Sequence, residues 1–136
     1  MRREHAVIVY NGELYNTSEV RTDLEKQGYV FPTRSDTEVV LTAYLAWGEA
    51  CLERLNGIYA FAVWDMQKQE LFFARDRIGV KPFFFTEKNG TFLFASEIKT
   101  LLAHPDISAE IDENGISELV LLGPGRTPGC GVLRGM

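Results

Sequence analysis

Three consecutive residues, Asn11, Gly12 and Glu13, are the first place in this sequence where residue types and spacing could do chemistry. They follow the β-branched run Ala6–Tyr10, which predicts a strand. Asn11-Gly12 is also typical of a tight turn, which is the structural explanation of the pair. The chemical explanation is an oxyanion hole, because an asparagine amide and a glycine N–H can both donate to a developing alkoxide. Glycine suits that role because it has no Cβ to block a substrate.

A second chemical candidate is Asp36, which the capping-box pattern from Ser35 to Glu38 places in the first turn of a helix. Its structural role would be to complement the positive end of the helix dipole, with Ser35 as the cap and Glu38 as the capping-box acid. Its chemical role would be to hold an ammonium group, as an amino-acid ligand requires. The sequence pattern alone leaves both roles open.

The two cysteines offer no arrangement typical of a reactive thiol. Cys51 lies on an apolar helical stretch, which predicts a buried and inert thiol. Cys130 lies between two glycines in a loop, and neither cysteine has an adjacent histidine that could act as a base. His5 and His104 are isolated, so we expect no metal site. Two unclustered cysteines favour a reducing, cytoplasmic location.

A charged segment, Arg75–Pro82, joins two very apolar runs. Its structural explanation is a turn held together by internal Arg–Asp pairs. A segment this dense in charge could also position neighbouring loops. The sequence leaves both explanations open.

Helices in the first part of the chain and strands in the middle must position these residues. Turn and capping signals predict helices from Asn16 to Gln27, from Ser35 to Trp47 and over Glu49–Leu55. Aromatic-rich runs predict strands at Ile58–Trp64, Leu71–Ala74, Phe83–Phe85 and Phe92–Ala95. Asn89-Gly90 predicts a hairpin between the last two strands, and two further helices are expected at Ser96–Ala103 and Asp112–Leu122.

The predicted strands are apolar on both faces, which is not the pattern of a sheet with one face in water. We therefore expect helices outside two packed sheets, an arrangement that covers both faces. This places four aromatic side chains in the core: Phe61, Trp64, Phe73 and Phe84.

Length and charge limit the function classes. The chain has 136 residues and a net charge of −5, which indicates one acidic domain and argues against nucleic-acid binding. No apolar run is long enough to span a membrane. Residues 1–122 are expected to form the domain, and the glycine- and proline-rich residues 123–136 a linker.

Five ordered motifs carry a resemblance that covers nearly the whole chain: YNGELYN, SDTEV, LNGIYAFAVWD, RDRIGVKPFFF and FASEIKTLL. In this order they resemble the glutaminase domain of the class II glutamine amidotransferases. Within that family the chain is similar to the glutamine-hydrolysing asparagine synthetase branch, which the GPGRTPGCGV stretch also resembles.

The resemblance implies an α+β fold, the four-layer α/β/β/α sandwich of the N-terminal-nucleophile hydrolases. It implies that Asn11 and Gly12 form an oxyanion hole and that Glu13 and Asp36 hold the α-amino end of L-glutamine. It also implies that an N-terminal cysteine attacks the glutamine amide and that ammonia is released. We expect no cofactor for this domain, and ATP and magnesium in a synthetase domain absent from these residues.

The sequence departs from the family pattern at its start, where Arg2 instead of cysteine follows Met1. We therefore expect an incomplete sandwich that lacks its nucleophile, is truncated at both ends and is inactive alone. Bared strand edges would favour self-association, such as a homodimer. Two alternatives stay open: a relative of amidophosphoribosyltransferase or glucosamine-phosphate synthase, and a catalytically dead binding or structural module.

Overall fold

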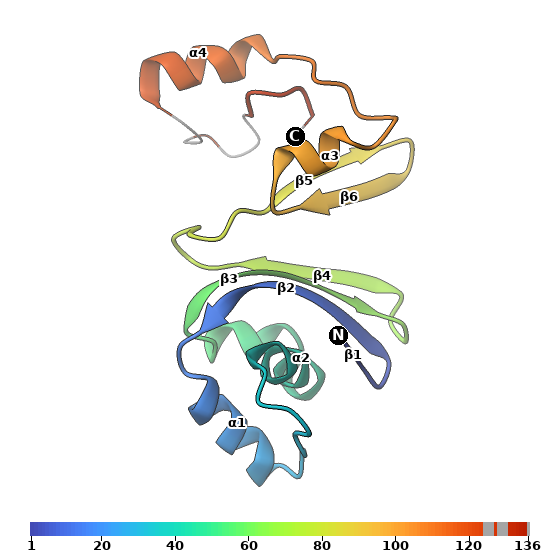
Figure 1. The fold of residues 1–136 in the computed structure, drawn as a ribbon, viewed down its shortest axis with the longest axis vertical. Helices are drawn as coiled ribbons and strands as arrows, with labels where there is room; N and C mark the ends of the chain where they lie inside the picture. Colours follow the sequence, from blue (N-terminus) through green and yellow to red (C-terminus); the bar gives the residue numbers. More distant parts are fainter. Residues whose placement is uncertain (124–126, 128–130, 136) are drawn as a thin grey trace. The chain divides into compact units, whose positions relative to one another are not determined.

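The computed structural model describes residues 1–123, 127 and 131–135. Helices and antiparallel strands confirm the α+β class expected from the sequence. The chain forms two compact units, Met1–Pro82 and Phe83–Met136, and each has its own antiparallel sheet (Figure 1). No helix among the described residues is long and apolar enough to cross a membrane. The predicted division into a domain and a linker stays a prediction.

The first unit is built on a four-stranded antiparallel sheet in the order β1-β2-β3-β4. Its strands are β1 (Arg2–Arg3), β2 (Ala6–Leu14), β3 (Gly57–Asp65) and β4 (Glu70–Arg75). Two helices, α1 (Thr17–Lys26) and α2 (Asp36–Trp47), lie on one face of this sheet, and the short 3-10 helix η1 (Gly48–Glu53) follows α2 (Figure 1).

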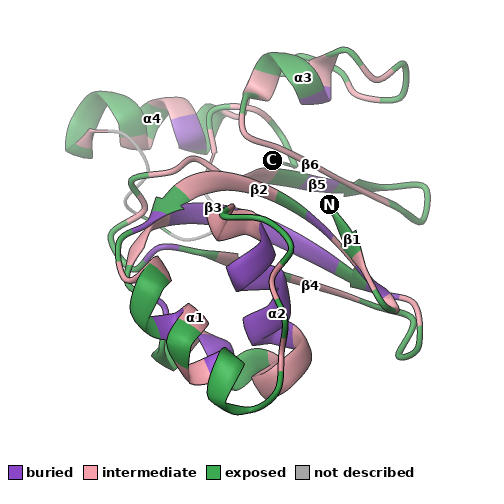
Figure 2. Ribbon diagram, turned by 60° about the horizontal axis from the view of Figure 1, so that its bottom comes forward, coloured by how far each residue is buried: buried purple, intermediate pink, exposed green. Residues whose placement is uncertain are grey.

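The core of this unit lies between α2 and the sheet. Seven consecutive residues of α2, Glu38–Tyr44, are buried, which confirms the prediction of a buried helix from its apolar sequence (Figure 2). Phe61 on β3 is 1% exposed and packs in this core, as predicted. The Tyr44 and Phe72 rings stack with centroids 5.2 Å apart, and this contact joins α2 to β4.

Trp64 and Phe73 were also predicted in the core, and for them the prediction is wrong, because their side chains are 39% and 43% exposed. The pleat explains the difference. Phe61 points toward the helices, whereas Trp64, three residues later, points to the opposite face, which Phe73 shares through its pairing with Ala62. Val9, paired with Ala62 from the other side, is 55% exposed on this outer face. Phe84 in the second unit is half-buried.

The exposed outer face, marked by Val9, Trp64 and Phe73, supports the prediction that the 136-residue polypeptide self-associates. Light scattering is expected to report a mass above that of the monomer. Phe73→Lys should shift the mass toward the monomer, because a charge on an apolar strand face opposes pairing. A clean monomer of the unsubstituted chain at high concentration would contradict this prediction.

The expected turn at Asn11-Gly12 is not present, because β2 runs straight through both residues to Leu14. Asn11 pairs with Ala60 and Gly12 with Tyr59 on β3. A Cβ on Gly12 would lie 2.5 Å from the Ile58 carbonyl oxygen, so glycine is needed here for the close approach of the two strands. Glycine at position 12 therefore permits strand pairing and does not form a turn.

The two expected capping boxes also differ from the structure, because neither Asn16 nor Ser35 makes a side-chain cap hydrogen bond. The Asn16 amide instead donates to the Arg54 carbonyl at 2.9 Å and accepts from the Asn56 N–H at 3.0 Å, which ties the end of β2 to the start of β3. Glu38 reaches back to Thr33 rather than to the Ser35 N–H.

The second unit contains the hairpin of β5 (Phe84–Lys88) and β6 (Thr91–Ala95), followed by α3 (Ile98–Leu102) and α4 (Glu113–Leu122). Asn89 and Gly90 both have positive φ, as the predicted hairpin turn requires. The Asp112 carboxylate caps α4 by accepting from the Asn114 and Gly115 N–H groups. The Arg134 N–H donates to the Glu110 carbonyl at 2.9 Å, so Arg134 lies beside the residues that precede α4.

The charged loop after β4 is held by bonds to its own backbone rather than by Arg–Asp pairs. The buried Asp76 carboxylate accepts from the Val80 and Lys81 N–H groups, each at 2.9 Å. The Arg75 guanidinium donates to the Gly79 and Lys81 carbonyls at 2.6 and 2.5 Å. The loop is thus a rigid turn whose Ile78 side chain points into solvent, 84% exposed.

Asp76→Asn is expected to destabilise the fold by about 1–3 kcal/mol, because the amide leaves one buried N–H unsatisfied. Burial raises the pKa of Asp76, but the backbone N–H bonds outweigh it and hold that pKa below the ordinary 3.8. Such a lowered folded-state pKa contributes stability above pH 3.8 that is lost as the pH falls further. Urea unfolding between pH 2 and pH 7 should show a smaller acid loss for the variant, with Asp23→Asn on exposed α1 as control.

Candidate functional site

The candidate site begins at the outer edge of β2, defined here as the main-chain groups of Tyr10, Gly12 and Leu14. The Tyr59 carbonyl accepts a hydrogen bond from the Asp76 N–H, so the main-chain groups of Tyr59 point toward β4. Tyr59 therefore exchanges no main-chain hydrogen bond with Gly12, although the two residues are opposite each other in the sheet. The Gly12 N–H therefore points away from β3. On that side β1 pairs with Ala6 and Val7, and Met1 bonds the main chain of Ile8.

Asp36, the first residue of α2, brings its carboxylate to this same edge. Its Oδ2 atom accepts from the Tyr10 hydroxyl at 3.0 Å and from the Leu14 N–H at 3.3 Å. Its Oδ1 atom accepts from the Thr37 N–H at 2.8 Å. The carboxylate thus contacts β2 on both sides of Gly12 along the strand and is half-buried.

Tyr10 and Leu14 are contacts of Asp36 that the sequence analysis did not single out. Burial, and after it the neighbouring Asp36 carboxylate, raise the pKa of Tyr10 far above its ordinary value of 10.0. The hydroxyl therefore stays protonated near neutral pH and can donate its hydrogen bond to Asp36. The sequence spacing could have predicted Tyr10 as a neighbour of the site, because a residue two positions before Gly12 lies on the same face of the strand.

Asn11 and Glu13 lie on the other face of β2, because they alternate with Tyr10 and Gly12. Asn11 shares its face with Ala60 and, across the sheet, Arg75. Glu13 is exposed and pairs with Ile58. The structure thus places the Asp36 carboxylate against Tyr10 and Leu14, on either side of Gly12 along β2, while the side chains of Asn11 and Glu13 leave the strand on the opposite face.

A hydrogen-bond network holds the segment that leads into Asp36. The buried Glu38 carboxylate accepts from the N–H and hydroxyl of Thr33, at 3.0 and 2.5 Å. The Arg3 guanidinium lies 3.4 Å from Glu38, donates to Thr42 at 3.0 Å and donates to the Val30 carbonyl at 2.8 Å. These contacts fix the start of α2 against β1.

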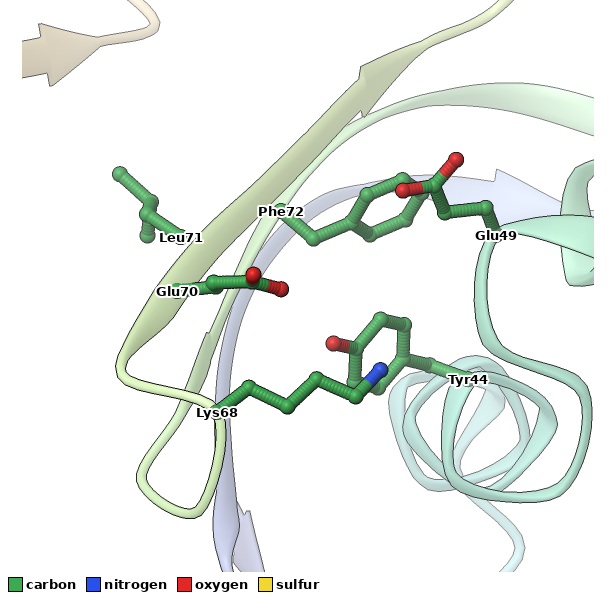
Figure 3. Close-up of a pocket in the computed structure, with 6 residues that line it drawn as sticks. All are labelled: Tyr44, Glu49, Lys68, Glu70, Leu71 and Phe72. Atoms are coloured by element: carbon green, nitrogen blue, oxygen red, sulfur yellow. The ribbon is translucent and has the colours of Figure 1, made fainter.

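Two hollows in the first unit have walls that do not include the residues predicted to bind substrate. One, of about 510 Å³, lies between the start of β3 and the charged loop, and its walls include Tyr15, Tyr59 and Ile78. The other, of about 330 Å³, lies between α2 and β4, where the Lys68 amine extends over the Tyr44 ring; Glu49 and Glu70 are also in its walls (Figure 3). Asn11, Gly12, Glu13 and Asp36 line neither hollow.

Cys51 has the inert environment that the sequence predicts. Its side chain is fully buried, and this burial raises the pKa of the thiol to about 12. A thiol with this pKa is not a nucleophile near neutral pH. Cys130 lies outside the described residues. Among the residues that the structure does describe, no three His, Cys, Asp or Glu side chains are grouped to hold a metal ion.

Residues 1–135 match the protein family described as the glutamine amidotransferase domain. The chain belongs to this family. Over 129 residues this glutamine amidotransferase domain is 57% identical to asparagine synthetase [glutamine-hydrolyzing] 3 of Bacillus subtilis, an alignment that covers 95% of the chain and 21% of the relative. It is 42% identical to a putative asparagine synthetase [glutamine-hydrolyzing] of Mycobacterium tuberculosis, over 85% of the chain and 18% of the relative. The domain therefore spans about a fifth of the length of these relatives.

Two solved structures resemble the domain in fold. One is the glutamine phosphoribosylpyrophosphate amidotransferase of B. subtilis, with a TM-score of 0.63 and 28% identity over 74% of this chain and 24% of that one. The other is described as the allosteric regulatory enzyme of purine biosynthesis, with a TM-score of 0.62 and 29% identity over 71% of this chain and 22% of that one. These likenesses support the N-terminal-nucleophile hydrolase-like fold.

Proposed function

We propose that this domain binds L-glutamine and releases its side-chain ammonia for the ATP-dependent amidation of aspartate in a longer, asparagine synthetase-like protein. The observation that carries the proposal is that the Asp36 carboxylate bonds Tyr10 and Leu14, two residues before and after Gly12 on β2. Gly12 supplies a backbone donor and Asp36 a carboxylate, which are the groups needed at the two ends of a glutamine molecule. The 57% identity to a B. subtilis asparagine synthetase favours aspartate as the acceptor.

In the proposed reaction, Asp36 holds the α-ammonium group of glutamine. The thiol gives its proton to a base and attacks the side-chain amide carbon, the amide nitrogen takes up that proton, and the C–N bond breaks to release ammonia. The Gly12 N–H would stabilise the oxyanion. The Asn11 amide would have to reach this edge from the opposite face of β2 to share that role, and so would Glu13 to assist at the α-amino end. Water then hydrolyses the thioester to glutamate and the free thiol. The buried Cys51 is unsuited to this attack, and Cys130 has no adjacent histidine in the sequence to act as its base, so we propose that a thiol outside these 136 residues is the nucleophile.

ATP and magnesium would bind in the longer protein outside this domain, where they would activate the acceptor carboxylate. The glutaminase step itself uses thiol, carboxylate and amide groups. The choice of acceptor is therefore a property of the longer protein rather than of the residues described here. Self-association through the outer face and a cytoplasmic location likewise remain proposals.

Acceptor dependence tests the proposal. The full-length protein should release glutamate from glutamine when given aspartate and ATP, and asparagine should form in step with it. Phosphoribosylpyrophosphate in place of aspartate and ATP should give no aminated product. Amination of phosphoribosylpyrophosphate would instead identify the amidophosphoribosyltransferase alternative, and a folded protein with no glutamate release under either condition would favour a binding module.

A further inference from the structure

The Asp36 carboxylate is held by more than its own helix. Tyr10 and Leu14 both donate to Oδ2, whereas Thr37, the next residue of α2, donates to Oδ1. A carboxylate has about four lone-pair sites, so these three bonds leave capacity for one further donor. We propose that Tyr10 is a positioning residue, which orients Asp36 to bind the α-ammonium group of glutamine. This inference rests on the function proposed above.

Strand geometry explains why a residue of β2 should do this. Tyr10 and Leu14 lie two residues before and after Gly12, and both bond one Asp36 oxygen, Tyr10 through its hydroxyl and Leu14 through its main-chain N–H. Residues two apart in a strand are separated by roughly 7 Å. The Tyr10 hydroxyl therefore ties the carboxylate that would bind the amine to the same strand that carries the backbone donor for the amide.

The donor is also chemically suited to its task. The raised pKa of Tyr10 keeps its hydroxyl protonated, so it donates to Asp36 whether or not a ligand is bound. A fixed hydrogen bond to a carboxylate reduces the orientational freedom that ligand binding would otherwise have to remove. Loss of this bond should weaken the recognition of an α-ammonium group without changing groups that act on the amide.

A second tyrosine–aspartate bond in the same unit provides a matched control. The Tyr44 hydroxyl donates to the buried Asp65 at 3.3 Å, and Asp65 also accepts from the Gln67 and Lys68 N–H groups. This bond lies at the turn between β3 and β4 and has no contact with Asp36. Tyr44→Phe therefore removes the same chemical group from the same type of partner but away from the proposed site.

The test compares Tyr10→Phe with Tyr44→Phe in the full-length protein, using glutamine, its analogue 4-carbamoylbutanoate, which lacks the α-amine, and free ammonia. Tyr10→Phe should lower kcat/KM for glutamine roughly tenfold, the usual effect of losing one hydrogen bond to a charged group, mainly through KM. Its kcat/KM for the analogue and its ammonia-dependent rate should not change. Tyr44→Phe should leave the ratio of glutamine to analogue unchanged.

Equal loss of glutamine and analogue hydrolysis in Tyr10→Phe would overturn the inference, because it would show a general structural role. An unchanged glutamine KM would overturn it as well. If the unsubstituted protein does not hydrolyse glutamine, the proposed function fails and the inference fails with it. If Asp36→Asn impairs glutamine use while Tyr10→Phe does not, the proposed function stands and only this inference is wrong.

Discussion

Asp36→Ala is expected to remove most glutamine-dependent synthesis by the full-length protein while it leaves ammonia-dependent synthesis intact. The Asp36 carboxylate lies at the outer edge of β2, where it can pair with the α-ammonium group of the substrate. A charge-assisted contact of this kind contributes about 1.5–3 kcal/mol, which corresponds to a loss of roughly 10- to 100-fold in kcat/KM. Free ammonia does not use this contact. Steady-state rates with each nitrogen source measure the difference.

The controls for Asp36→Ala separate binding from folding. Asp23→Ala on α1 removes an exposed carboxylate that pairs only with Lys26 among the described contacts, and it should affect neither nitrogen source. Asp36 also bonds the Leu14 and Thr37 N–H groups, so a purely structural role is the competing explanation. Equal loss of both activities in Asp36→Ala would show that this carboxylate supports the fold rather than the substrate.

The second large effect concerns catalysis by the 136-residue polypeptide itself, which is expected to release no glutamate from glutamine. The proposed reaction needs a thiolate, and burial raises the pKa of the Cys51 thiol to about 12. At neutral pH such a thiol is almost wholly protonated and has no base beside it. An oxyanion hole alone gives only residual acceleration and forms no thioester.

A coupled glutamate assay on the purified polypeptide measures this directly. Cys51→Ala and Cys130→Ala are the matched variants, and both should behave like the parent chain. Turnover that persists through purification and disappears in one of these variants would contradict the prediction and identify that cysteine as a nucleophile. A low rate of glutamate release that is equal in the parent chain and both variants would come from a contaminating enzyme.

Local signals in the sequence predicted the elements whose structure depends on near neighbours. Asn89-Gly90 gave the hairpin because both positions need positive φ, and the apolar run in α2 gave a buried helix. The prediction of a turn at Asn11-Gly12 was wrong, because a contact with residues distant in the sequence determines the conformation there. Gly12 lies against the backbone of Ile58 and Tyr59, and the sequence around Gly12 does not indicate that these residues are its neighbours.

The site shows the same division between local and non-local information. Asp36 could be predicted at the start of a helix, but its contact with Tyr10 joins residues 26 positions apart. The capping role expected for Glu38 failed because Thr33 and Arg3 compete for its carboxylate. The prediction that Trp64 and Phe73 lie in the core was wrong, because apolar residues on both faces of a strand do not show which face packs against the helices.

The transfer of nitrogen from glutamine to the product tests the central claim most directly. Full-length protein would be given glutamine labelled with ¹⁵N at the side-chain amide, together with aspartate, ATP, magnesium and unlabelled ammonium at a lower concentration. Mass spectrometry should find the label in the side-chain amide of asparagine, and Asp36→Ala should shift that amide to unlabelled nitrogen. Asparagine that carries only unlabelled nitrogen in the unsubstituted protein would contradict the account.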